Sequence, residues 1–137
     1  MRKRLAFLWT PLVLGLALML PASTAATSYG KIVFVGGYCT GNNTVHATFR
    51  LQKYSGFYAT KLTITAKGQG YHNGHWFTEY NIGTASKMVN TSGKASMTRD
   101  VFYVPGHNGT HRIAATGKIW NGGTVLAKGG IRSGTCV

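Results

Sequence analysis

The sequence predicts an all-β protein, most simply an antiparallel sandwich of about seven strands in two sheets. β-branched and aromatic residues come in short runs that alternate with polar residues, as they do in half-buried strands. Gly and Asn residues separate these runs, and no stretch has the period of an amphipathic helix. Two stacked sheets would bury the apolar face of every strand, and a small β-barrel is the alternative closure.

The first three strands show the pattern most clearly. The short apolar run KIVFV, residues 31–35, is the first strand. Residues 43–54 alternate apolar and polar positions, with Phe49 on the apolar face. Residues 57–67 alternate in the same way, with Leu62 on the apolar face. Because successive side chains of a strand point to opposite faces, each of these two strands has one face for the core and one for water.

Four more strands are expected in the second half of the chain. Their apolar and aromatic residues come in runs that Gly, Asn and Pro separate. They span residues 75–82, 94–104, 110–120 and 124–132. The residues 83–93 between the first two of them fit either a loop or an eighth strand.

The two cysteines, Cys39 and Cys136, fall near the two ends of the expected domain. In an exported chain two cysteines indicate one disulfide, which requires Cα atoms within about 7 Å of each other. If every connection reverses the chain, seven strands return the C-terminus to the end of the sandwich where Cys39 lies, whereas eight strands place it at the far end. The expected disulfide therefore favours an odd number of strands.

The N-terminus has the layout of a cleaved secretory signal peptide. The basic start RKR precedes an apolar run over residues 5–20, and small residues follow. We therefore expect residues 1–26 to be removed. Residues 27–137 would then form one secreted, extracellular β-sandwich domain of bacterial origin with no transmembrane segment.

The expected mature domain is strongly cationic. Three of the 15 Lys and Arg residues lie in the predicted signal peptide, which leaves twelve against Glu79 and Asp100 and a net charge of +10. Such a charge attracts anions, so it concerns partners and not the fold. The expected partners are an anionic polysaccharide or cell-wall polymer, or nucleic acid bound without sequence specificity.

Basic and aromatic side chains on the polar sides of the strands are the candidate binding residues for such a polymer. Cations beside exposed aromatic rings suit sugars, single-stranded nucleic acid or an anionic surface. The sequence thus favours a non-catalytic module that associates with an anionic extracellular polymer or cell surface. The candidates are Arg50, Lys61, Lys67, Arg112 and Lys118 for charge and Tyr58, Trp76 and Trp120 for ring contacts.

Four of the five histidines flank the Asn-Gly pairs of YHNGHW and GHNGTH. Asn-Gly is the preferred centre of a type I′ hairpin turn, which predicts such a turn at Asn73-Gly74. Polar turn flanks are therefore the favoured interpretation, with no metal or cofactor. Two facing imidazoles with a third would nevertheless suit Zn²⁺, Cu²⁺ or Ni²⁺. The candidate ligands are His72, His75, His107 and His111, which strand counting places, with His46, at the disulfide end.

Two other classes of function fit the composition. A cationic antibacterial or toxin protein would share the charge. A small basic ribonuclease would use Glu79, His75 and a neighbouring cation for acid–base chemistry beside a phosphate. No nucleophile elbow, phosphate-binding loop or pair of carboxylates for glycoside hydrolysis occurs in the sequence. The favoured expectation is therefore a protein that is not an enzyme.

Two segments carry a resemblance to known proteins. TVHATFRLQKYSGFYATKLTITAKG, residues 44–68, resembles a pattern of small secreted proteins of Gram-positive bacteria. There, a strand ending in Leu-Gln-Lys leads through an aromatic, Gly-containing turn into a second alternating strand. FYVPGHNGTHRIAATGKIWNGGTVLAKGGIRSG, residues 102–134, looks like the last three strands of an immunoglobulin-like or fibronectin-like sandwich. The resemblance implies an immunoglobulin-like fold and export, and it carries over no functional residue.

Overall fold

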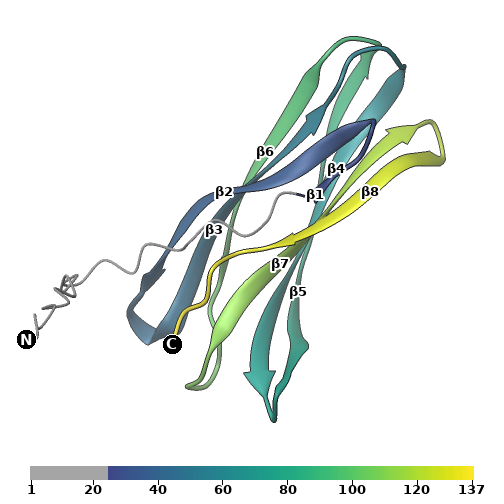
Figure 1. Cartoon of the computed structure of the whole chain (residues 1–137). Coiled ribbons are helices and arrows are strands. Elements are labelled where there is room, and N and C mark those ends of the chain that lie inside the picture. The colour runs from purple at the N-terminus through teal and green to yellow at the C-terminus, as the bar shows by residue number, and fades with distance from the viewer. Residues whose placement is uncertain (1–24) are drawn as a thin grey trace, which may run out of the picture.

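The computed structural model describes residues 25–137, which form two packed antiparallel sheets (Figure 1). Sheet A has the strand order β1-β2-β3-β6, and sheet B has the order β5-β4-β7-β8. In chain order the elements are β1 (Ala25–Ala26), β2 (Gly30–Thr40), the 3-10 turn η1 (Gly41–Asn43), β3 (Thr44–Lys53), β4 (Ala59–His72), β5 (His75–Thr91), β6 (Ala95–Tyr103), β7 (His111–Asn121) and β8 (Thr124–Arg132).

The predicted all-β sandwich is confirmed. Besides the two-residue β1, seven antiparallel strands divide three and four between the sheets, and within residues 25–137 the sheets do not close into a barrel. Each of the seven corresponds to one predicted strand, in the predicted order. β5, the fourth of the seven long strands, pairs with β4 in sheet B. In a constant-type immunoglobulin domain the fourth strand instead joins the sheet that contains the first strand.

The core forms where the apolar faces of the interior strands meet between the sheets. β3, β4 and β7 each have a strand on both sides, and their alternation is the clearest in the sequence. Burying one large aliphatic or aromatic side chain stabilises a fold by about 1.5–3 kcal/mol. Fully buried residues of these strands include Phe49, Leu62, Ile64, Ile113 and Ile119.

Three strands run longer than predicted. β4, predicted at residues 57–67, continues to His72. The strand predicted at residues 31–35 continues as β2 to Thr40 through a register shift after Phe34. Residues 83–93 are neither a loop nor an eighth strand, because β5 continues through them to Thr91. β5 is an edge strand of sheet B, so it needs no continuous apolar face and gives a weak alternation signal. The number of long strands stays odd.

The predicted Cys39–Cys136 disulfide is present, with Cα atoms 5.7 Å apart. His111, the first residue of β7, pairs with Cys136 through two backbone hydrogen bonds of 2.8 Å. In Figure 1 the C-terminus, the β2–β3 connection and the β4–β5 turn lie toward the same end of the sandwich. This disulfide end carries the histidine turns, as the strand count predicts.

The opposite end of the sandwich encloses a buried lysine. Lys53, the last residue of β3, is 1% exposed. Its Nζ donates to the carbonyls of Tyr54 and Gly93 over 2.9 Å and 2.7 Å and lies 4.1 Å from the ring centre of Phe57. Burial lowers the pKa of this ammonium group. Lys53 therefore closes the core and contributes little to the surface charge.

The predicted signal peptide lies almost entirely outside the described residues. Only its last two residues, Ala25 and Ala26, are described; they form β1, which pairs with Lys31 and Ile32 of β2. Cleavage after residue 26, as the sequence predicts, would remove β1 and leave three strands in sheet A. Within residues 25–137 no helix has the length and apolar character needed to cross a membrane.

Replacing both Cys39 and Cys136 with Ser is expected to destabilise the domain. The bridged residues are 97 positions apart, and restricting the unfolded chain over such a loop corresponds to about 4 to 5 kcal/mol. Denaturant unfolding followed by tryptophan fluorescence measures the free energies. A reducing agent should bring the wild-type protein to the midpoint of the variant and leave the variant unchanged. Equal midpoints under oxidising conditions would contradict this role of the disulfide.

Candidate functional site

A polar cluster occupies the disulfide end of the core, where the inward side chains of β4 are no longer large. The ring of Tyr103 lies where a Cβ on Gly68 would stand, and the Glu79 carboxylate lies where a Cβ on Gly70 would stand. These two glycines are therefore required for close approach, and any larger residue would displace the cluster. Along β4 the inward side chains become smaller, from Leu62 and Ile64 through Ala66 to Gly68 and Gly70.

A β-bulge in β5 directs Glu79 toward this space. Gln69 pairs with Thr78 and Gly68 pairs with Tyr80, so Glu79 is the extra residue between two regular pairs. A bulge bends its strand and changes the direction of its side chains. As a result, Glu79 and Tyr80 both line the hollow between β5 and β6.

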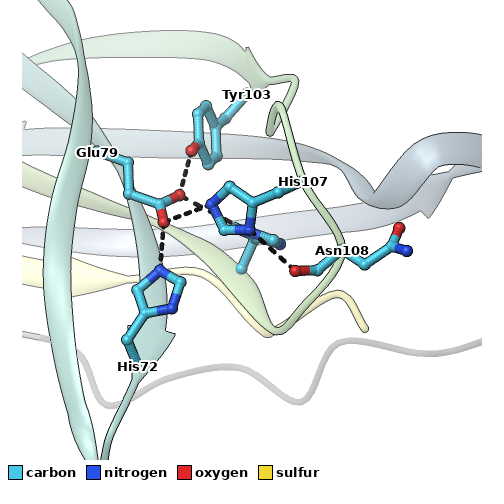
Figure 2. Close-up of polar contacts among 6 residues, drawn as sticks. His72, Glu79, Tyr103, His107 and Asn108 are labelled. Carbon is cyan, nitrogen blue, oxygen red and sulfur yellow. Dashed lines mark hydrogen bonds and ion pairs between the residues drawn. The ribbon is translucent and has the colours of Figure 1, made fainter.

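Three side chains donate hydrogen bonds to the Glu79 carboxylate (Figure 2). His72 Nε2, at the end of β4, and His107 Nε2, in the β6–β7 loop, both donate to Oε1, over 2.6 Å and 2.8 Å. The hydroxyl of Tyr103, at the end of β6, donates to Oε2. We call these four residues, together with His111, the Glu79 cluster.

The hydrogen bonds of the cluster hold the negative charge on Glu79. Burial favours a higher pKa for this carboxyl group, but the hydrogen bonds from His72, Tyr103 and His107 outweigh burial and lower the pKa to about 2. Burial and the bond to Glu79 raise the pKa of the Tyr103 hydroxyl. His107 donates its other ring nitrogen, Nδ1, to the Asn108 carbonyl over 2.9 Å, and this bond and the one to Glu79 raise the His107 pKa.

His111 is the member of the cluster whose polar atoms are not satisfied. Its side chain is fully buried at the start of β7, and neither ring nitrogen has a hydrogen-bond partner among the described residues. Its Nε2 lies 3.5 Å from Oε2 of Glu79. Burial lowers the pKa of His111. An unpaired buried polar atom costs about 1–3 kcal/mol, so this imidazole destabilises the core unless a further partner binds it.

The cluster is open to solvent on one side. The side chains of His72 and His107 are 44% and 46% exposed. A hollow of about 680 Å³, which His107 helps to line, lies between β5 and β6, the edge strands of the two sheets. Glu79 lines this hollow together with Tyr80 and Arg99. A small ligand or an ion can therefore reach the carboxylate without unfolding of the domain.

The predicted hairpin turn is confirmed, but only one of its histidines joins the cluster. Asn73 and Gly74 have φ of 49° and 83°, as a type I′ turn requires. His72 and His75 are direct cross-strand partners, yet His72 is the one that reaches Glu79. The sequence predicts that His72 and His75 face each other, but the two imidazoles that share Glu79 are those of His72 and His107.

The second Asn-Gly pair belongs to a different kind of connection. Asn108 and Gly109 lie in the loop from β6 of sheet A to β7 of sheet B. Gly109 has a φ of 138°, and Asn108 is not in the left-handed region. The loop is thus not a type I′ hairpin. It carries His107 from one sheet toward the other and places it over Glu79.

His46 lies at the disulfide end but outside the cluster. It is on β3 of sheet A, where its Nε2 and the Thr40 hydroxyl are 3.1 Å apart and its ring stacks on Tyr38 with 4.4 Å between centroids. The five histidines thus all lie toward the disulfide end, as the strand count predicts. Three of them surround Glu79.

Tyr103 is not among the candidate residues that the sequence indicates, and Glu79 is a candidate there only as the acid–base group of a ribonuclease. The signal for both residues is the pair Gly68 and Gly70. In a strand whose inward positions are otherwise apolar, two inward glycines indicate that side chains from elsewhere approach the backbone there.

Four of the five predicted cations share the outer face of sheet B. Pairing among β4, β7 and β8 places them on the side away from the core. No side-chain carboxylate lies on this face. Of the two acids of the chain, Glu79 points into the Glu79 cluster and Asp100 lies on β6 of sheet A. We call this surface the basic face. Its cations are Lys61, Lys67, Arg112, Lys118, Lys128 and Arg132.

Two of the predicted aromatic residues lie on the basic face against its cations. The guanidinium of Arg112 lies 3.8 Å from the ring centre of Trp76. The ammonium groups of Lys61 and Lys118 lie 4.9 Å and 5.5 Å from the ring centre of Trp120. These distances are within the range of cation–π contacts.

The other two predicted polymer-binding residues lie apart from the basic face. Arg50 is exposed on sheet A, where its Nε donates to Thr98 over 3.4 Å. Tyr58 is 46% exposed in the connection between β3 and β4. The fold thus brings six of the eight predicted residues onto one surface and leaves these two elsewhere.

Comparisons with protein-family models, with curated proteins and with solved structures found no match to this chain.

Glu79→Gln is expected to reduce the loss of stability in acid. A carboxyl group whose pKa in the folded protein is about 2, below its ordinary 4.5, stabilises the fold fully above about pH 4.5 and loses this effect as the pH falls toward 2. The wild-type protein should lose on the order of 3 kcal/mol through this group, and the variant should not. Denaturant unfolding across this pH range measures the difference. Parallel pH profiles for the two proteins would contradict the assignment.

Proposed function

We propose that the protein is a secreted, non-catalytic cationic module that binds an anionic extracellular polymer through the basic face. The observation that carries this proposal is the gathering of six cations and two tryptophans on one side of sheet B with no side-chain carboxylate among them. Solubility requires charge but not a single sign of charge. Because such a surface attracts opposite charge before contact, a polyanion is the class of partner that fits.

Some cations of the basic face are placed against one another. Lys118 and Lys128 are direct cross-strand partners, and like charges in this position destabilise a sheet. Burial and the neighbouring Arg132 lower the pKa of Arg112 to about 10. An anionic chain lying across the face would relieve this repulsion, whereas a neutral ligand would not.

Ring contacts favour an anionic polysaccharide or cell-wall polymer among the possible polyanions. Nε1 of Trp120 donates to the Thr63 hydroxyl over 2.9 Å, which fixes the indole against the sheet. Lys61 and Lys118 adjoin this ring. A fixed indole beside two ammonium groups can stack on a sugar while the cations contact its anionic substituents. Nucleic acid is the second class of partner, held through its phosphates without sequence readout.

Removing charge from the basic face is expected to weaken binding more than removing it elsewhere. The exported, disulfide-bonded protein would be tested against sulfated, uronic and neutral polysaccharides and RNA over a salt series. We expect at least about a tenfold loss of affinity at low salt and a shallower salt dependence for the basic-face variant, since fewer counterions are released. The basic-face variant is Lys61→Gln/Lys67→Gln/Lys118→Gln, and the control of equal charge change is Lys31→Gln/Arg50→Gln/Lys94→Gln.

Equal losses in the two variants would show that total charge drives binding, and would contradict the role of the basic face. The absence of wild-type binding to every polyanion at low salt would contradict the whole proposal. Permeabilisation of bacterial cells by the purified protein would favour the antibacterial alternative. Cleavage of RNA in the presence of EDTA would favour a ribonuclease.

Trp120→Leu separates ring contact from charge. The change keeps both neighbouring lysines and the net charge. Since stacking is insensitive to salt and contributes about 1–3 kcal/mol per ring, we expect the variant to lose about fivefold or more in affinity for an anionic polysaccharide at high salt, with an unchanged salt slope. Tyr58→Leu, outside the basic face, is the control and should bind as the wild type does. Equal behaviour of the two variants would contradict a stacking role for Trp120.

A further inference from the structure

We infer that the Glu79 cluster is a binding site for a divalent transition-metal ion of the Zn²⁺ class, with His72, Glu79 and His107 as ligands and the buried His111 next to the site. The inference concerns the inner side of sheet B and uses none of the residues of the basic face. It therefore stands or falls independently of polymer binding.

The ligand atoms of three of these side chains already lie close enough to share one ion. One ligand atom from each of His72, Glu79 and His107 lies within 4.8 Å of the other two. Tetrahedral coordination with bonds of about 2.0–2.1 Å places neighbouring ligand atoms about 3.3 Å apart. The contacts of 2.6 Å and 2.8 Å from the two histidines to Oε1 differ from this spacing by less than 1 Å. Imidazole nitrogens with one carboxylate oxygen form a ligand set that suits Zn²⁺.

The second contacts of the ligands resemble those that orient ligands in metal sites. His107 donates from Nδ1 to the Asn108 carbonyl, which directs Nε2 toward the carboxylate. The Tyr103 hydroxyl donates to Oε2 of Glu79 and leaves Oε1 facing the two histidines. Metal-bound histidines commonly donate their other nitrogen to a carbonyl, and metal-bound carboxylates are themselves hydrogen-bonded.

His111 is an independent indication of an additional partner. It is fully buried, both of its ring nitrogens lack a hydrogen-bond partner among residues 25–137, and its Nε2 lies 3.5 Å from Oε2 of Glu79. A hydrogen-bond network centred on Glu79 accounts for His72, Tyr103 and His107 but leaves His111 unsatisfied. An ion bound beside Glu79 would give Nε2 of His111 a partner, because neutral imidazole offers one lone pair to a metal, and the Nδ1 of His111 would stay unpaired.

The position of the cluster is compatible with a dication despite the net positive charge. Glu79 is one of only two acidic residues in the chain, and the cations of the basic face point to the other side of sheet B. Arg99, which lines the adjacent hollow, is held by hydrogen bonds of 2.7 Å to the carbonyls of Ile64 and Gly83. The half-exposed rings of His72 and His107 provide a route for the ion from solvent.

The test is titration of the exported, disulfide-bonded protein, freed of metal with EDTA and dialysed, with Zn²⁺ in a calorimeter. We expect one equivalent to bind with a Kd of about 10 µM or tighter and to raise the melting temperature, because a ligand of the folded state stabilises it. Mg²⁺, which prefers oxygen ligands, should do neither. Substituting Co²⁺ should give the visible absorption of a tetrahedral nitrogen–oxygen site.

The matched variants are His72→Ala and His75→Ala, which change the two flanks of the same turn. We expect His72→Ala and His107→Ala to weaken Zn²⁺ binding at least about 100-fold, because losing a direct ligand should cost more than the about 10–100-fold that losing a hydrogen-bond partner of a ligand costs, and His75→Ala to stay within twofold of the wild type. His72 and His107 are half-exposed, so these variants retain the core. No heat and no shift in melting temperature at saturating Zn²⁺ would overturn the inference, as would equal losses in His72→Ala and His75→Ala.

Discussion

The inner face of β4 is the constraint on which both the core and the Glu79 cluster depend. In the middle of this strand, large side chains such as Leu62 fill the space between the sheets. Nearer the disulfide, Gly68 and Gly70 leave the same space open. Side chains from β5, the neighbour of β4 in sheet B, and from β6 of sheet A enter this space. Glu79 and Tyr103 are those side chains.

Sheet B separates the basic face from one of the two carboxylates of the chain. Its outer side carries the basic face, and its inner side holds Glu79 among histidines and a tyrosine. The other carboxylate, Asp100, accepts a hydrogen bond from Thr48 over 2.6 Å on sheet A. With both acids placed away from the lysines of the outer face, the field of that face is uncompensated. The positive potential of the basic face thus depends both on the low number of acids and on their position away from this face.

The sequence predicted the sandwich and the disulfide because interior strands must alternate and because the strand number decides where the chain ends meet. Prediction failed where the signal depends on a neighbouring strand. Residues 83–93 gave no clear pattern, since an edge strand has no fully buried face. The orientation of Glu79 depends on a register shift between β4 and β5, which counting along one strand cannot locate. Tyr103 occupies a regular inward position of its strand. The space for its ring exists because the residue across the core is Gly68, which has no side chain.

The two similar motifs YHNGHW and GHNGTH show why the candidate ligands arise from topology more than from local sequence. The first connects neighbours within sheet B, so His72 on β4 faces the core while its partner His75 begins an edge strand with no neighbour beyond it. The second connects β6 of sheet A to β7 of sheet B and crosses the end of the sandwich. That crossing brings His107 above Glu79 and starts β7 with the buried His111. Three histidines therefore meet one carboxylate because two sheets converge at the end that the disulfide ties together.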